Sequence, residues 1–222
     1  MAGNLDTIRH RIATAAARAG RDPGDVTLVA VSKTIPPAGI EDALAAGQTL
    51  FGESKLQEAN AKIPLISSRA HWHMIGHLQS NKARDAVALF ELIHSVDSVP
   101  LAGEINKWAD RAGKTQPILL EINVAGEARK FGFKPDAVEA ALREIHALPR
   151  LEVAGLMTIA PYTDDPERAR PFFRQLRALR DRLGLRQLSM GMTGDFEVAI
   201  EEGATFVRLG TALFGERKRH EE

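Results

Sequence analysis

The chain has 222 residues, of which 29 are basic and 29 acidic, so its formal net charge is zero and it has no general electrostatic attraction to nucleic acid or anionic lipid. It contains no cysteine, which excludes a disulfide scaffold and a thiolate metal site. No run approaches the roughly 20 apolar residues that span a bilayer, and we expect a cytoplasmic protein that binds neither membrane nor nucleic acid.

The N-terminal segment 1–20 has the spacing of an amphipathic helix, with Leu5, Ile8 and Ile12 on one face. It lacks the apolar core of a signal peptide. After this helix, eight short apolar runs alternate with segments of helical spacing. The predicted strands are 27–33, 48–53, 71–76, 91–96, 117–124, 151–158, 186–191 and 205–210.

This alternation predicts an α/β fold with a parallel sheet. A series of eight βα units closes most economically into a single (β/α)8 barrel of the TIM type, here with an extra N-terminal helix. A doubly wound open sheet is the alternative, but its first turn is usually rich in glycine, whereas the first turn here reads SKTIPPAG. No linker divides the chain, so we expect one domain over 1–222 that ends in a frayed tail, 216–222.

The first predicted strand ends in a lysine, in the run LVAVSKT at residues 28–34. Either Lys33 is the solvated end of an ordinary strand, or the strand delivers its amine into a pocket. Polar residues follow nearly every predicted strand, and the C-terminal strand ends of a βα barrel form its active site. In a partly desolvated pocket, a lysine has a lowered pKa and attacks a carbonyl to form a Schiff base. That carbonyl belongs to a substrate, as in lysine-type aldolases, or to pyridoxal 5'-phosphate (PLP), which would need a phosphate cradle.

The segments after the seventh and eighth predicted strands have the composition of such a cradle. In the segment 188–203, Ser189 supplies a hydroxyl and Gly191 permits close backbone approach. Gly210 and Thr211 follow the eighth strand, and phosphate sites of barrels frequently occupy these two loops. The alternative is an ordinary turn followed by a helix cap.

The same segment predicts a helix that begins near Gly194, capped by Thr193 or Asp195. The first N–H groups of that helix would point toward an anion.

Arg208 lies within the apolar eighth strand, where an unpaired guanidinium is costly. It must therefore face a polar pocket or a carboxylate, for which Glu53 and Asp97 are candidates. Facing a pyridine nitrogen, an arginine would donate a hydrogen bond and keep that nitrogen unprotonated.

The segment HWHMIGHLQSNK, residues 71–82, holds three histidines but no obvious carboxylate to orient them and no HExxH helix. We therefore expect no metal site. We expect Ile75 and Gly76 to form the floor of a ligand pocket instead.

Together, these motifs resemble the pyridoxal phosphate homeostasis proteins of the YggS/PROSC type, which are related in fold to the N-terminal barrel of alanine racemase. The resemblance runs in the order of the family from residue 30 to residue 217. The matching stretches are AVSKT, FGESKLQEANAK, WHMIGHLQSNK, IHSVDS, EINVAGEARKFGF, GLMTIAPY, LSMGMTGDFEVAI and VRLGTALFGER.

The resemblance implies that Lys33 carries PLP as an internal aldimine, that Arg208 faces the pyridine nitrogen, and that Ile75 and Gly76 line the ring. The implied phosphate ligands come from the two loops of the cradle. The full set of implied cofactor-binding residues is Lys33, Ser54, Ile75, Gly76, Ser189, Met190, Gly191, Arg208, Gly210 and Thr211. Members of the family bind PLP and act in its intracellular homeostasis, so PLP-dependent apoenzymes are the implied recipients and no catalysed reaction is implied.

The chain departs from the family pattern at Ser54 and Lys55, where the family usually has asparagine and tyrosine. A shorter hydroxyl thus replaces an amide near the cofactor, and an amine replaces an aromatic ring. Thr193 keeps the hydroxyl of the usual serine.

The alternative function is a PLP-dependent amino-acid racemase. Such an enzyme needs a base on each face of the cofactor, typically a lysine and a tyrosine. The single tyrosine of the chain, Tyr162, lies in a predicted loop after the sixth strand. A cofactor-free aldolase is a third possibility, but it leaves the phosphate cradle unexplained.

Overall fold

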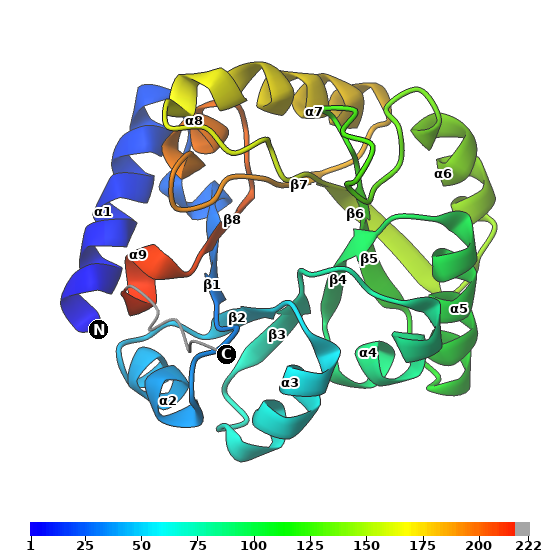
Figure 1. Cartoon of the computed structure of the whole chain (residues 1–222), viewed down its shortest axis with the longest axis horizontal. Coiled ribbons are helices and arrows are strands. Elements are labelled where there is room, and N and C mark those ends of the chain that lie inside the picture. The colour runs from blue at the N-terminus through cyan, green and yellow to red at the C-terminus, as the bar shows by residue number, and fades with distance from the viewer. Residues whose placement is uncertain (216–222) are drawn as a thin grey trace.

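Eight parallel strands follow one another around a closed barrel, and the last strand returns to pair with the first (Figure 1). This structure, a computed structural model, describes residues 1–215, so the predicted tail 216–222 lies outside the described residues. The strands are β1 (Thr27–Val31), β2 (Leu50–Glu53), β3 (His71–Met74), β4 (Leu92–Val96), β5 (Gln116–Glu121), β6 (Leu151–Met157), β7 (Gln187–Ser189) and β8 (Phe206–Leu209). Each predicted strand coincides with one of these, which confirms the TIM-type barrel and excludes the open sheet.

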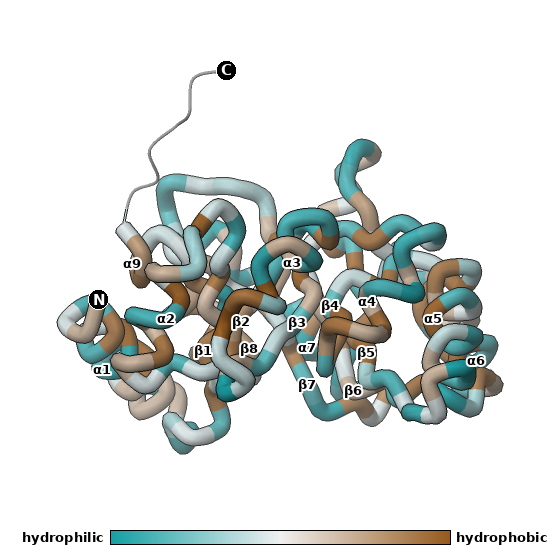
Figure 2. Tube along the Cα trace, turned by 90° about the horizontal axis from the view of Figure 1, so that it is seen from below, coloured by the Kyte–Doolittle hydropathy of each residue, from teal (hydrophilic) through white to brown (hydrophobic). Residues whose placement is uncertain are grey.

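Helices connect the strands and surround the barrel (Figure 1). The α-helices are α1 (Ala2–Arg18), α2 (Pro37–Ala45), α3 (Leu56–Lys62), α4 (Ala83–Leu89), α5 (Val99–Arg111), α6 (Val138–His146), α7 (Arg170–Arg182), α8 (Phe196–Glu201) and α9 (Thr211–Phe214). Short 3-10 helices are η1 (Pro23–Asp25), η2 (Ile63–Leu65), η3 (Ser80–Lys82) and η4 (Pro166–Ala169). In the side view of Figure 2, α1 and α6 lie at opposite ends of the molecule.

The predicted N-terminal helix is α1, and its apolar face is the predicted one. Leu5, Ile8 and Ile12 are all buried, because this face packs against α8 and α9. The helix therefore covers the part of the barrel where the chain closes on itself.

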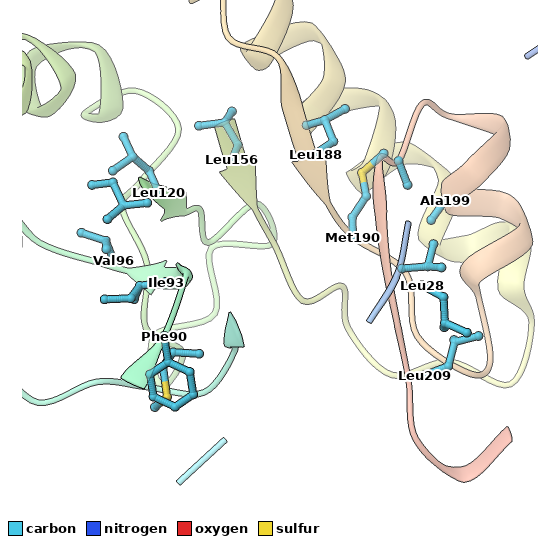
Figure 3. Packing of buried hydrophobic residues seen from close by; sticks show 14 of the residues in the cluster. Leu28, Phe90, Ile93, Val96, Leu120, Leu156, Leu188, Met190, Ala199 and Leu209 are labelled. Atoms are coloured by element: carbon cyan, nitrogen blue, oxygen red, sulfur yellow. The ribbon is translucent and has the colours of Figure 1, made fainter. Parts of the chain in front are cut away.

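Apolar side chains cover both faces of the barrel wall. The outer cluster lies between strands and helices, and Figure 3 shows Ile93, Leu120 and Leu156 among its members. Their neighbours in sequence, Leu92, Leu119 and Met157, form a separate cluster with Phe206 packed against it. Because successive side chains of a strand point to opposite faces, this second cluster lies inside the barrel. Ligand cavities therefore belong to the two ends of the barrel rather than to its wall.

Strands β6 and β7 approach each other most closely at Gly155, which pairs with Gln187. A Cβ atom on Gly155 would lie 2.0 Å from the carbonyl oxygen of Gln187. We expect Gly155→Ala to lower the free energy of unfolding by about 2–4 kcal/mol. Overpacking a core is costly, and the backbone of Gln187 cannot easily move away from the added methyl group because it is part of the sheet.

Gly103→Ala is the matched control for this prediction. Gly103 lies within α5, where a Cβ atom would meet nothing within 4 Å. This variant should raise the free energy of unfolding by roughly 0.5–1 kcal/mol, the usual gain from replacing glycine inside a helix. Denaturant unfolding of both variants measures the contrast, and equal stability of the two would contradict it.

Candidate functional site

A cavity of about 430 Å³ opens at the C-terminal ends of β1, β6 and β8, where a βα barrel carries its active site. Its volume suits a small cofactor. Four of the residues predicted for the site line it together: Lys33, Arg208, Gly210 and Thr211. The other lining residues are Val31, Lys130, Ile159, Ala160, Pro161, Tyr162, Thr163, Met192, Thr193, Gly194 and Asp195.

Lys33 lies two residues beyond the end of β1 and is exposed at this cavity. The loops around the cavity leave its side chain open to solvent. The amine is accessible to an incoming carbonyl compound. The alternative of an ordinary strand end does not explain why it shares a cavity with a buried arginine.

The backbone beside Lys33 is held in a strained conformation. Thr34 has a φ of 64°, and among residues 1–215 it is the sole non-glycine residue with a positive φ. For a β-branched residue this conformation costs of the order of 1–3 kcal/mol and marks functional sites more often than other places. The N–H group of Thr34 donates a hydrogen bond of 2.5 Å to Oε1 of Glu58, which helps to hold this conformation.

The residue before Lys33 is anchored by a buried ion pair. Lys62 is 6% exposed, and its Nζ lies 2.8 Å from Oε1 of Glu53 and 2.6 Å from Oε1 of Glu58. It also donates a hydrogen bond of 2.8 Å to the carbonyl oxygen of Ser32, whose hydroxyl donates to Glu53 over 2.7 Å. We call Ser32, Glu53, Glu58 and Lys62 the Lys33 clamp, because they fix the backbone on both sides of Lys33.

Arg208 extends from β8 into the barrel and is 4% exposed. Its Nη1 donates to the hydroxyl of Ser189 over 2.6 Å, and its Nη2 donates to the carbonyl oxygen of Thr158 over 2.9 Å. Burial lowers the pKa of Arg208 to about 10, while Glu121 and Asp195 act in the opposite direction. The guanidinium remains charged at neutral pH and faces the cavity.

Neither carboxylate predicted for Arg208 is its partner. Glu53 belongs to the Lys33 clamp, and Asp97 instead pairs with His77, with 3.2 Å between Oδ2 and Nδ1. The two candidates were wrong because a sequence does not show which of several acidic strand ends faces a given arginine. The other part of the expectation is met, since Arg208 lines the cavity.

Glu121, the last residue of β5, was not among the predicted site residues. Burial, together with the nearby charge of Asp97, raises the pKa of Glu121 to about 7. Its position as a charged residue near the end of a predicted strand was the signal that could have identified it as a site residue.

The loop after β7 lines the cavity, and the helix that follows it begins about two residues later than predicted. Thr193, Gly194 and Asp195 line the cavity, and α8 begins at Phe196 rather than near Gly194. Asp195 stands at the cap position of α8, but its carboxylate accepts from the N–H of Met192 over 2.6 Å rather than from the helix. Thr193, which was predicted as a possible helix cap and replaces the usual serine of the family, thus lines the same cavity as Thr211.

The remaining predicted site residues lie outside the lining of this cavity. Ser189 points into the barrel toward Arg208. Met190 and Gly191, which follow it, are buried. The assignment of Ser189 and Gly191 to the phosphate, and of Met190 to the cofactor, stays a prediction.

Ile75 and Gly76 lie beside Ser54 at the end of β3. A Cβ atom on Gly76 would lie 2.2 Å from the carbonyl oxygen of Ser54, so only glycine fits there. Ile75 packs over Gly52, close to the first strand. Both positions are compatible with a pocket floor, which stays a prediction.

A larger cavity, of about 680 Å³, lies at the opposite, N-terminal ends of the strands. It is rich in arginine, but each guanidinium already has an oxygen partner. These contacts are Arg21 with the carbonyl oxygen of Ile200, Arg177 with Glu202, Arg180 with Asp181 and Arg186 with Glu152. Their charge is thus largely balanced, and no lysine lines this cavity within residues 1–215. We therefore take the smaller cavity as the candidate functional site.

Within residues 1–215, no three His, Asp or Glu side chains are placed to hold a metal ion together. None of the helices in this part of the chain combines the length and the apolar character that crossing a bilayer would need.

Comparison with known proteins gives a consistent set of relatives. The family model described as "Alanine racemase, N-terminal domain" matches residues 3–218. A pyridoxal phosphate homeostasis protein of Aquifex aeolicus is 45% identical over 221 residues, covering 96% of this chain and 97% of the relative. One of Pseudomonas aeruginosa is 43% identical, covering 98% and 96% of the two chains. The solved structure of PipY from Synechococcus elongatus with PLP bound is 39% identical and covers 94% of this chain and 100% of that chain, with a TM-score of 0.82.

Proposed function

Because this chain belongs to the pyridoxal phosphate homeostasis protein family, we propose that it binds PLP covalently through Lys33 and acts in intracellular PLP homeostasis. The observation that carries the proposal is the shared cavity: the accessible amine of Lys33, the buried guanidinium of Arg208 and the hydroxyl of Thr211 line one space of about 430 Å³. The amine condenses with the aldehyde and releases one water, which leaves the cofactor attached as a Schiff base.

The lining residues fit the three parts of PLP. Thr193, Gly194 and Thr211 offer hydroxyl and backbone donors of the kind that bind phosphate. Arg208 supplies a fixed cation for the ring nitrogen, because its own hydrogen bonds go to neutral oxygen atoms and its charge stays available. Lys33 supplies the amine.

A storage or carrier protein fits this site better than a racemase. The phenol of Tyr162 is 93% exposed and lies 3.1 Å from Oδ1 of Asp164. This hydrogen bond raises the pKa of Tyr162 above its ordinary value, which makes the phenolate a poorly populated base. An arginine that keeps the ring nitrogen unprotonated weakens the ring as an electron sink. This suits simple binding or proton exchange at one carbon, so Arg208 does not by itself separate a carrier from a racemase. We propose PLP-dependent apoenzymes of the cytoplasm as the recipients of the cofactor.

The test is to mix the purified protein with PLP, reduce it with borohydride and map the modified peptide by mass spectrometry. We expect an absorption band of a protonated Schiff base and one pyridoxyl group on the peptide that contains Lys33. Lys33→Ala should abolish both. Lys55→Ala is the control, because Lys55 begins the turn into α3 and does not line the cavity. Label on Lys55 or Lys130 instead of Lys33 would contradict the assignment.

The absence of turnover is tested separately. Solvent deuterium should not exchange rapidly with the α-hydrogen of common amino acids in the presence of the PLP-loaded protein. Rapid exchange with racemisation would favour the racemase alternative.

A further inference from the structure

Inside the barrel, polar side chains from four strands form one hydrogen-bonded chain that ends at Arg208. His73 of β3 and His94 of β4 are joined by 3.0 Å between Nδ1 and Nε2, respectively. His94 Nδ1 lies 2.8 Å from the hydroxyl of Ser189 on β7, which lies 2.6 Å from Nη1 of Arg208 on β8. Phe206 packs against both imidazole rings and against the apolar cluster of Leu92, Leu119 and Met157.

The direction of these hydrogen bonds follows from the chemistry of the groups. An arginine only donates, so the Ser189 oxygen accepts from Arg208 and its own proton must go elsewhere. Within the described residues, the one remaining partner of that hydroxyl is Nδ1 of His94. His94 therefore accepts at Nδ1, carries its proton on Nε2 and donates to His73. Both rings are neutral, since burial lowers the pKa of His73 to about 4 and lowers that of His94 well below its ordinary value.

Ser189 is fully buried and does not line the cavity, whereas Arg208 does. The hydroxyl of Ser189 is occupied on both sides, by a donor and by an acceptor. It has no free proton to offer a phosphate. Its hydrogen bond to Nη1 instead fixes the orientation of the guanidinium of Arg208. That guanidinium forms no ion pair with any residue among 1–215.

We propose that Ser189 and His94 are positioning residues for Arg208, and that Ser189 is not a phosphate ligand. This inference rests on the proposed function, because it concerns how Arg208 meets the ring of the cofactor. The chain from His73 to Ser189 lets a charged group stay buried and fixed while its remaining N–H groups point to the cavity.

The two roles of Ser189 are separated by comparing PLP with pyridoxal, which has the same ring and aldehyde but no phosphate. A positioning role predicts that Ser189→Ala weakens the binding of both aldehydes by the same factor, about tenfold for the loss of a hydrogen bond to a charged group. Thr211→Ala is the matched control, because its hydroxyl lines the cavity. Thr211→Ala should weaken the binding of PLP by a similar factor and leave the binding of pyridoxal unchanged.

A second readout is the absorption maximum of bound PLP, which responds to the surroundings of the ring nitrogen. Ser189→Ala and His94→Leu should both shift it, whereas Thr211→Ala should not.

Three outcomes overturn the inference. Ser189→Ala weakens the binding of PLP but not of pyridoxal, or it weakens the binding of neither aldehyde. The third is that Ser189→Ala leaves the absorption maximum of bound PLP unchanged. If the wild-type protein does not bind pyridoxal measurably, the spectral shift alone decides. A wild-type protein that binds no PLP at all would refute the proposed function itself, and the inference with it. Equal weakening of both aldehydes with a shifted maximum supports it.

Discussion

Lys62→Met is expected to lower the free energy of unfolding by about 3–5 kcal/mol, the usual cost of removing one partner of a buried ion pair. Lys62 is the cation that Glu53 and Glu58 share. Glu53 is fully buried and its Oε2 has no hydrogen-bond partner among the described residues, so without Lys62 its charge would be uncompensated. Burial already raises the pKa of Glu53 above its ordinary value. Urea unfolding of the two proteins measures the difference.

Lys107→Met is the matched control for this prediction. Lys107 lies 2.9 Å from Oε2 of Glu104, but both side chains are exposed on α5. A surface pair of this kind contributes about 0–1 kcal/mol. A second variant that also carries Glu53→Gln should recover part of the loss, because it removes the stranded charge. Equal effects of Lys62→Met and Lys107→Met would show that the Lys33 clamp does not stabilise the fold.

Glu121→Gln is expected to stabilise the protein at about pH 8 and to have little effect near pH 4.5. The pKa of Glu121 is raised from 4.5 to about 7 in the folded protein, chiefly by burial. Its contribution to stability is therefore fully present below pH 4.5 and is lost as the pH rises through about 7. Since one pKa unit corresponds to about 1.4 kcal/mol, and since Glu121 is partly exposed, the gain from the substitution at high pH is about 2–3 kcal/mol.

The contribution of His73 to the free energy of unfolding changes with pH in the opposite direction to that of Glu121, over an overlapping pH range. Its pKa is lowered from 6.5 to about 4, so its contribution is present above pH 6.5 and is lost as the pH falls toward 4. The two groups oppose each other in the wild type between about pH 4.5 and 6.5. Glu121→Gln should therefore lose stability more steeply on acidification than the wild type does.

Urea unfolding of the cofactor-free protein at a series of pH values measures these slopes. For Glu104→Gln, at an exposed position of α5, the curve of unfolding free energy against pH should be parallel to that of the wild type. Parallel curves for Glu121→Gln and the wild type would contradict the assignment of the raised pKa.

The barrel was predictable because each strand is a short run of branched and aliphatic residues between turn signals. Eight such strands that alternate with helices can form few kinds of sheet, and a closed barrel is the most economical of them. The same regularity placed Lys33, Gly210 and Thr211 at one end of the barrel. Both results depend only on local pattern and on the rule that parallel strands end on the same side.

The partners within the site were not predictable in the same way. Glu53 pairs with Lys62 on the next helix, and Arg208 bonds to Ser189 and Thr158. Each choice depends on the register and twist of neighbouring strands, which no single segment encodes. The accessibility of Lys33 likewise depends on how the loops after β6 and β7 fold over the cavity.

The strained backbone at Thr34 has a consequence for the thermodynamics of ligand capture. Ordering one residue of a mobile loop costs about 1–2 kcal/mol of conformational entropy, and many lysine-bearing loops would pay this on binding. Here Glu58 and Lys62 hold the segment 32–34 in place through contacts that involve no ligand, so that cost is met when the chain folds. The amine of Lys33 is therefore presented from a preorganised support. Loss of a bound aldehyde would return no entropy to this segment, which suits the reversible binding of PLP that we propose.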